Sequence, residues 1–147
     1  MRKFSVSKEI EFDAGHRVPD HASKCRNPHG HRYKVRAHVV GDLQTEGSST
    51  GMVIDFGDIK KQLTEKVHDV FDHGFIVHEE DYSMLRAFAS SDEVDSWKII
   101  VVQWVPTAEN MAKWIYEVLT PLIPGLWAIE VYETPTSIAF YPADAEQ

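Results

Sequence analysis

Two segments near the start of the chain alternate between apolar and polar residues. From Phe4 to His16 the apolar side chains fall almost entirely on one phase, and Ser, Glu and Asp occupy most of the other. A second alternating segment runs from His29 to Val39, with Arg and Lys on its polar phase. A period of two predicts strands with one buried face. Each apolar phase carries histidine at one end, so imidazole rings are expected where a buried face ends.

Helical spacing appears twice farther along the chain. Apolar residues including Ile59 and Leu63 recur after Asp55, a residue type that caps helices, which predicts a helix over residues 56–71. A second helix is predicted to begin at Thr107, where a proline precedes it and further prolines end it.

Three more strands complete the prediction. The β-branched run at 98–105 lies between the helices, after an acidic stretch at 79–95, and a hairpin of 126–134 and 137–141 closes the chain. The expected order is strand, strand, helix, helix, strand, strand, with one extra strand inserted between the helices. This pattern indicates an α+β protein, and 147 residues with 43% hydrophobic content suit a single domain over residues 1–147.

Charge is distributed unevenly. The net charge is −8, which argues against nucleic acid as a partner, but residues 1–36 hold nine Lys or Arg against four acids. That basic segment would attract a small polyanion, although Arg32, Lys34 and Arg36 could equally solvate the outer face of a strand. The sequence shows no apolar run long enough to cross a bilayer and no signal peptide, so a cytoplasmic, membrane-free protein is expected.

Three histidines have spacings that suit one metal ion. His29 and His31 are two residues apart, so both rings point to the same side of an extended chain, and His16 ends the preceding strand. Neutral imidazole is a preferred zinc ligand, and three such ligands leave a coordination position open for water or substrate, as catalytic zinc sites do. The alternative for any single ring is a hydrogen-bonded core histidine.

Cys25 and Glu133 are the other candidates for chemistry. Cys25 is the only cysteine, which excludes an internal disulfide. It could be an inert thiol, a fourth zinc ligand, or a thiolate favoured by the neighbouring Lys24, Arg26 and metal. Glu133 continues the apolar phase of the last hairpin, which makes it partly buried, so either protein groups or the N–H groups of a ligand must satisfy it.

At this point the sequence resembles the 6-pyruvoyltetrahydropterin synthase and 6-carboxytetrahydropterin synthase family over nearly its whole length. The resemblance rests on six motifs in order: Phe12-x-Ala-x-His16-Arg17, Cys25-x-x-x-His29-Gly30-His31, Gly51-Met-Val-Ile-Asp55-Phe56, Asp72-His73, Pro106-Thr107-Ala108-Glu109-Asn110 and Tyr132-Glu133-Thr134. The three-residue interval after Cys25 is similar to the 6-carboxytetrahydropterin branch, which supplies an early intermediate of queuosine and related 7-deazaguanines. The acidic stretch and the extra strand depart from the shorter members.

The resemblance implies the tunnelling fold (T-fold), an antiparallel sheet with two antiparallel helices on one face. Subunits of such proteins join edge to edge into barrels, commonly as a hexamer built from two trimers, with active sites at subunit boundaries. It also implies zinc as the cofactor, with His16, His29 and His31 as ligands, and no nicotinamide or flavin.

The resemblance implies further roles as well. Cys25 would be the general base, Asp72 and His73 an acid/base pair, and Glu133 the partner of the pterin N–H groups. Thr107 and Glu109 match a substrate-contact motif, although both suit the start of a helix equally well. The substrate would be 7,8-dihydroneopterin triphosphate. The rivals are a 6-pyruvoyltetrahydropterin synthase and, from another class, a non-catalytic binding module stabilised by zinc with Cys25 as fourth ligand.

Overall fold

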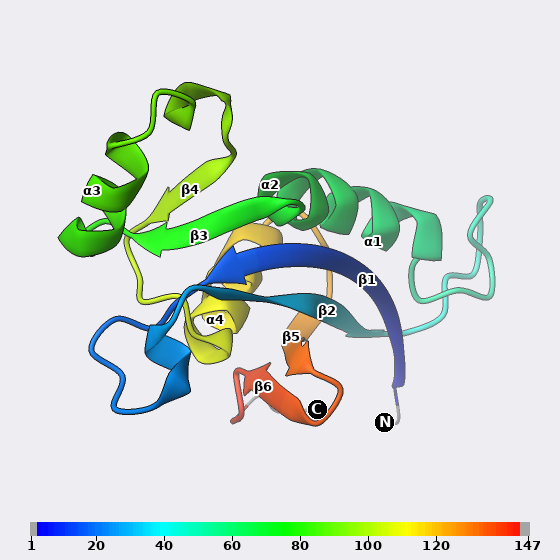
Figure 1. Ribbon diagram of the computed structural model, residues 1–147. Helices are drawn as coiled ribbons and strands as arrows, with labels where there is room; N and C mark the ends of the chain where they lie inside the picture. The colour runs from blue at the N-terminus through cyan, green and yellow to red at the C-terminus, as the bar shows by residue number, and fades with distance from the viewer. Residues whose placement is uncertain (1–2, 145–147) are drawn as a thin grey trace.

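A curled six-stranded sheet forms the molecule, and its two main helices pack on one face (Figure 1). The computed structural model describes residues 3–144. The strand order is β4-β3-β1-β2-β5-β6. The strands are β1 (Phe4–His16), β2 (His29–Gly41), β3 (Gly74–His78), β4 (Ile99–Val102), β5 (Leu126–Thr134) and β6 (Ser137–Tyr141), and the helices are α1 (Phe56–Leu63), α2 (Asp69–Phe71), α3 (Tyr82–Ala89) and α4 (Ala108–Leu119).

Strands β1 and β2 form a long antiparallel pair that carries the alternation seen in the sequence. Phe12, Tyr33 and Val35 lie on the buried face and are at most 1% exposed. His16 pairs with His29, and His31 pairs with Ala14 two residues away on β1. Directly opposed residues of an antiparallel pair point to the same side of the sheet, so this register brings the three histidines together at one end of the buried face.

The helices bury their apolar stripes against this sheet. Asp55 caps α1, since its side chain accepts a hydrogen bond from the Gly57 N–H at 2.7 Å. A π-helical turn, Thr64–His68, joins α1 to α2, so the predicted helix over 56–71 is nearly continuous. Thr107 caps α4 in the same way through the Asn110 N–H. Ile59, Leu63, Met111 and Ile115 of these helices are fully buried; both helix predictions are confirmed.

The segment between α2 and α4 differs from the prediction in detail. It contains two strands rather than one, with α3 between them, and β3 runs parallel to both β1 and β4. The sheet is therefore mixed and not wholly antiparallel, although the α+β T-fold is confirmed. Strands of four or five residues give no reliable periodic signal, and the acidic composition of the 79–95 stretch obscured the apolar spacing of α3, which has only eight residues.

The closing hairpin has the predicted bounds, but two bulges alter its phase. The pairing of β2 with β5 shifts register near His38, where Val39 pairs with Leu126 and His38 with Ala128. The extra residue, Trp127, packs on His38 on the outer face rather than joining the buried phase. A second register shift on the β6 side leaves Glu133 as an extra residue between Tyr132 and Thr134.

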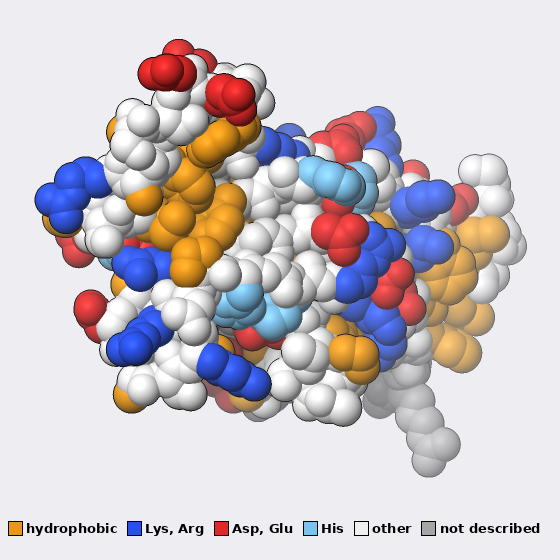
Figure 2. Space-filling model, viewed as in Figure 1, with side chains coloured by type: hydrophobic (Ala, Val, Ile, Leu, Met, Phe, Trp, Pro, Cys, Tyr) orange, Lys and Arg blue, Asp and Glu red, His pale blue; other side chains and the backbone are white. Residues whose placement is uncertain are grey.

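One view of the surface shows mixed charge beside an apolar patch. Basic and acidic side chains mingle on one side of the face in Figure 2, and apolar side chains gather over β3 and β4. Arg36 pairs with Glu9 at 2.8 Å and Arg32 with Asp13 at 3.1 Å on the outer faces of β1 and β2. Arg32 and Arg36 are therefore paired with acids of the neighbouring strand, whereas Lys34 lies over the Tyr132 ring. Within residues 3–144, none of the helices is long and apolar enough to cross a membrane.

Candidate metal centre

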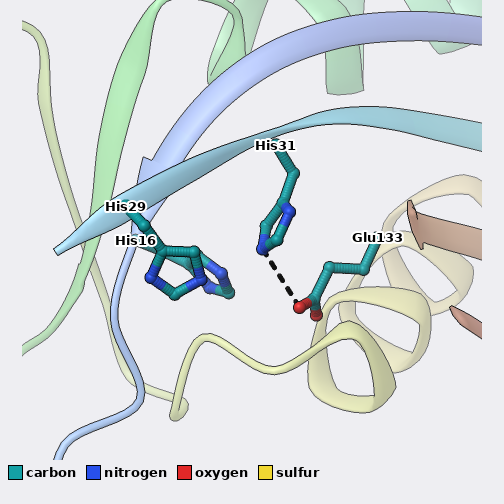
Figure 3. Close-up of side chains that lie close together, drawn as sticks. All are labelled: His16, His29, His31 and Glu133. Atoms are coloured by element: carbon teal, nitrogen blue, oxygen red, sulfur yellow. Dashed lines mark ion pairs between the residues drawn. The ribbon is translucent and has the colours of Figure 1, made fainter. Parts of the chain in front are cut away.

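Three imidazole rings converge where β1 ends and β2 begins. The ring centroids of His16, His29 and His31 lie 4.7, 5.1 and 4.8 Å apart. One nitrogen of each ring and one carboxylate oxygen of Glu133 all lie within 4.8 Å of one another. Figure 3 shows the rings and the carboxylate turned toward a common point. The sequence prediction that these histidines meet is thus matched by the geometry.

Backbone carbonyls fix which nitrogen can bind a metal in two of the three rings. His16 Nδ1 lies 2.6 Å from the carbonyl oxygen of Pro106, and His29 Nδ1 lies 2.6 Å from that of Asn27. A carbonyl only accepts hydrogen bonds, so Nδ1 carries the proton and Nε2 presents its lone pair. This arrangement is typical of metal-binding histidines, whose second nitrogen is held by an outer partner.

Two of the inward-facing nitrogens have no hydrogen-bond partner among residues 3–144. Nε2 of His16 and Nε2 of His31 are buried and unpaired. His31 Nε2 lies 3.1 Å from Glu133 Oε1, but this contact lacks hydrogen-bond geometry. Buried polar atoms are normally paired, so orphaned lone pairs that face one another indicate a ligand between them. The donor set fits a divalent metal that accepts imidazole, zinc foremost.

Burial keeps the rings in the form that binds metal. Desolvation lowers the pKa of His16 below its ordinary value, and the neighbouring histidine charges lower it further. The pKa of His31 is likewise lowered, chiefly by burial, while the Glu133 charge opposes the shift. Both rings are therefore neutral at pH 7, as metal ligation requires.

Glu133 reaches the centre because it lies at a bulge. Bulges re-aim side chains and are frequent beside active sites. Its side chain is 22% exposed, as expected for a partly buried acid. The same geometry allows two roles, because the carboxylate is close enough to the imidazoles to be a fourth ligand and exposed enough to meet a substrate.

Cys25 lies at the mouth of the centre without belonging to its convergent atoms. It sits in a 3₁₀ turn, Lys24–Arg26, and is partly exposed. A cavity of about 520 Å³ is lined by Cys25 together with His29, His31 and Glu133. This volume lies in the range of small-molecule sites, about 300–1,000 Å³. A ligand in the cavity would touch the thiol and the metal position at once.

Asp72 and His73 form a hydrogen-bonded pair outside the Cys25 cavity. Asp72 Oδ2 accepts from His73 Nδ1 at 2.8 Å, and this contact is the main reason that the pKa of Asp72 is below its ordinary value. Asp72 Oδ1 also accepts from the Asp13 N–H. His73 is 78% exposed in its side chain and lines a hollow of about 380 Å³ that includes Gly15. Within one chain, therefore, this pair does not line the cavity of Cys25.

The two candidates at the start of α4 have helix-terminal positions. Thr107 Oγ1 accepts a hydrogen bond from the Asn110 N–H at 3.2 Å, so the hydroxyl is used as the cap. Glu109 is exposed in the first turn, where a negative charge favours the helix. The capping interpretation of Thr107 is seen directly, and a substrate contact stays a prediction for both residues.

Sequence reasoning missed three residues that support these groups. Lys98 Nζ donates to the carbonyls of Asp69 and Asp72 at 2.9 and 2.8 Å. Arg17 forms an ion pair with Asp81, whose side chain is only 2% exposed. The only sequence signal was that Asp81 precedes a short apolar helix, as N-cap residues do; the pairings themselves join segments distant along the chain.

Comparisons with known proteins agree with this site. A family model described as 6-pyruvoyl tetrahydropterin synthase matches residues 5–144. The chain is 34% identical over 139 residues to the 6-carboxy-5,6,7,8-tetrahydropterin synthase of Haemophilus influenzae, covering 94% of this chain and 98% of that protein. It is 37% identical over 138 residues to the protein of the same name from Synechocystis, covering 92% and 91%.

Solved structures share the fold. An uncharacterized protein from Wolinella succinogenes superposes with a TM-score of 0.77 at 27% identity, covering 95% of this chain and 98% of that one. The 6-pyruvoyl tetrahydropterin synthase of Caenorhabditis elegans superposes with a TM-score of 0.66 at 24% identity, covering 96% of each chain. This second likeness bears on the fold alone.

Proposed function

Because the chain belongs to the 6-pyruvoyl tetrahydropterin synthase family, whose enzymes carry out lyase-type reactions on pterins, we propose that it is a zinc-dependent 6-carboxy-5,6,7,8-tetrahydropterin synthase. The proposed reaction converts 7,8-dihydroneopterin triphosphate and water into 6-carboxytetrahydropterin, acetaldehyde and triphosphate. The product would enter queuosine and related 7-deazaguanine synthesis in the cytoplasm. The names of the curated relatives support the carboxy product over the pyruvoyl one.

One observation carries the metal part of the proposal. The Nε2 atoms of His16 and His31 are buried, have no hydrogen-bond partner among the described residues and lie in one group with a ring nitrogen of His29, while backbone carbonyls hold two of the three rings. In a set of purely structural core histidines, these nitrogens would instead form hydrogen bonds. Bound zinc would supply Lewis acidity toward the hydroxyl groups of the substrate side chain.

Other residues of the chain transfer protons and bind the substrate. Cys25, which lines the cavity, takes a proton from the substrate side chain. Glu133 accepts hydrogen bonds from the 2-amino group and a ring N–H of the pterin, a two-point contact that suits a carboxylate. The basic 1–36 segment favours approach of the triphosphate.

Asp72 and His73 act as the second acid/base group, and the proposal places them in a neighbouring copy of the chain. Within one subunit neither residue lines the Cys25 cavity, and the hollow that His73 lines shares only His31 with it. β1 pairs with β3 only over Ala14–His16, so within the described residues its outer edge from Phe4 onward has no strand beside it, and β6 ends the sheet on the other side. Open edges favour edge-to-edge pairing. A hexamer of two trimers, with sites at subunit boundaries, would pair the open strand edges and would bring Asp72 and His73 of one copy to the Cys25 cavity of another.

Product analysis tests the function. Zinc-loaded protein incubated with 7,8-dihydroneopterin triphosphate should release acetaldehyde and triphosphate in equal amounts and form a carboxylated tetrahydropterin. Triphosphate release with a pyruvoyl product and no acetaldehyde would establish the nearest rival, a 6-pyruvoyltetrahydropterin synthase. Absence of any turnover would contradict both enzymes.

The non-catalytic rival is tested through Cys25. In a zinc-stabilised binding module Cys25 would be the fourth ligand, and Cys25→Ala would lose metal and fold. The thiol does not belong to the group of converging ligand atoms. We therefore expect Cys25→Ala to keep its zinc and its thermal stability while losing turnover.

A further inference from the structure

A partly buried ion pair links the segment after β3 to the loop that carries Cys25. Asp81 precedes α3 and is 5% exposed, and Arg17 directly follows His16 at the end of β1. Arg17 Nε donates to Asp81 Oδ2 at 2.7 Å, and a terminal guanidinium nitrogen donates to Oδ1 at 2.5 Å. Two parallel bonds between a planar guanidinium and a carboxylate fix the orientation of both groups.

The third guanidinium nitrogen reaches the thiol loop. Arg17 Nη1 donates to the carbonyl oxygen of Arg26, the residue after Cys25, at 3.5 Å. The Val18 N–H donates to the Cys25 carbonyl at 2.9 Å, so the backbone on both sides of Cys25 is tied to the stretch that begins at Arg17. The loop between β1 and β2 therefore depends on where Arg17 is held.

Asp81 determines that position from the other side. Its carboxylate accepts three hydrogen bonds, two from Arg17 and one from the Met84 N–H at 3.2 Å, which caps α3. The Arg17 bond is the main cause that lowers the pKa of Asp81. A buried charge with a single ionic partner binds that partner in one geometry, because any displacement leaves the charge unpaired. The proposed reaction assigns no step to Asp81.

We propose that Asp81 is a positioning residue for Cys25: acting through Arg17, it holds the loop at 17–28 so that the thiol stays at the mouth of the metal centre. The segment that contains α3 is then a support of the active site. This inference rests on the proposed function only for its effect on turnover, because the state of the loop can be measured in the absence of substrate.

Hydrogen exchange tests the coupling directly. Asp81→Asn keeps the size of the side chain and its capping oxygen but removes the charge and turns one accepting oxygen into a donor that opposes the guanidinium. Amide exchange in peptides covering 17–28 should become at least about tenfold faster in this variant, because the loop opens locally more often. Exchange across the β1–β2 pair should not change. Asp92→Asn, which removes an exposed acid of the same segment, should leave the loop as in the wild type.

A second variant covers the case in which Asp81→Asn does not fold. Arg17→Lys still neutralises Asp81 but cannot make two parallel bonds and reach Arg26 together, so faster exchange at 17–28 is again expected. If faster exchange is confined to 79–89 in the folded variants, Asp81 is only a helix cap and the inference is overturned.

Kinetics separate this inference from the proposed function. In an active enzyme, Asp81→Asn should lower kcat at least about tenfold with KM changed less than about threefold, since the thiol is displaced while the pterin contacts remain. Unchanged kcat in a variant with a loosened loop would overturn the positioning role. If the wild-type protein shows no turnover, the proposed reaction is refuted. The hydrogen-exchange result would still decide whether Asp81 holds the loop at 17–28.

Discussion

Replacing one imidazole should abolish the stabilisation that zinc gives the fold. The perturbation is His16→Ala, because His16 is 1% exposed and its Nε2 is one of the unpaired buried atoms. Its Nδ1 is held by the Pro106 carbonyl, so the ring cannot turn away from the centre without losing that bond. Zinc bound by three such rings binds only the folded chain, and its binding energy therefore adds to stability.

The size of the effect follows from mass action. A ligand present at about 100 times its dissociation constant stabilises the folded state by about 2.7 kcal/mol, and at about 1,000 times by about 4.1 kcal/mol. In a domain of about 150 residues each kcal/mol raises Tm by about 2–4 °C. Zinc should therefore raise the Tm of the metal-stripped wild type by about 5–16 °C, and that of His16→Ala by less than about 2 °C.

The assay compares thermal unfolding after chelation, with and without added zinc. His68→Ala is the matched control, since that ring is partly exposed and contacts Asp69 and Asp72 rather than the three histidines. The rise in Tm that zinc gives this variant should equal that of the wild type. A full zinc increment in His16→Ala, or none in the wild type, would refute the assignment of the metal site.

Other variants test the remaining groups. Glu133→Gln loses a charged acceptor, so KM for the pterin should rise about tenfold or more at unchanged zinc content; a fall in zinc content would instead make Glu133 a metal ligand. Lys98→Met removes the bonds that hold the Asp72 carbonyl, and kcat should fall about tenfold, whereas an unchanged kcat contradicts its support of the acid/base pair. Arg17 lowers the pKa of Asp81 from 3.8. The ion pair therefore stabilises the folded state fully at pH values above 3.8, and this contribution is lost as the pH falls through the lower pKa of the folded state. In urea unfolding the gap between wild type and Asp81→Asn should be constant from about pH 7 to about pH 5 and narrow in more acidic buffer; a gap that widens toward acid contradicts this.

The parts of the fold that the sequence predicted are those governed by local rules. Alternation on β1 and β2 was enough to place His16, His29 and His31 together, because antiparallel pairing of two such strands leaves few registers that bury both apolar faces. Asp55 and Thr107 carried the capping signal at the helix starts, and both caps are present.

What the sequence did not reveal depends on contacts between distant segments. The β3–α3–β4 segment consists of pieces too short to show a period, and its parallel pairing with β1 is a property of the assembled sheet. Strict alternation along the closing hairpin would put Trp127 on the buried face, but a bulge in the assembled sheet shifts the phase and puts it on the outer face. The Arg17–Asp81 pair spans 64 positions of sequence, and no local pattern joins the two residues.

X-ray absorption at the zinc edge tests the central claim most directly. The account predicts a zinc ion with three imidazole nitrogens at about 2.0–2.1 Å and an oxygen ligand, and no sulfur in the coordination shell. A zinc–sulfur distance of about 2.3 Å in the resting protein would show that Cys25 closes the site, and would contradict an open catalytic centre.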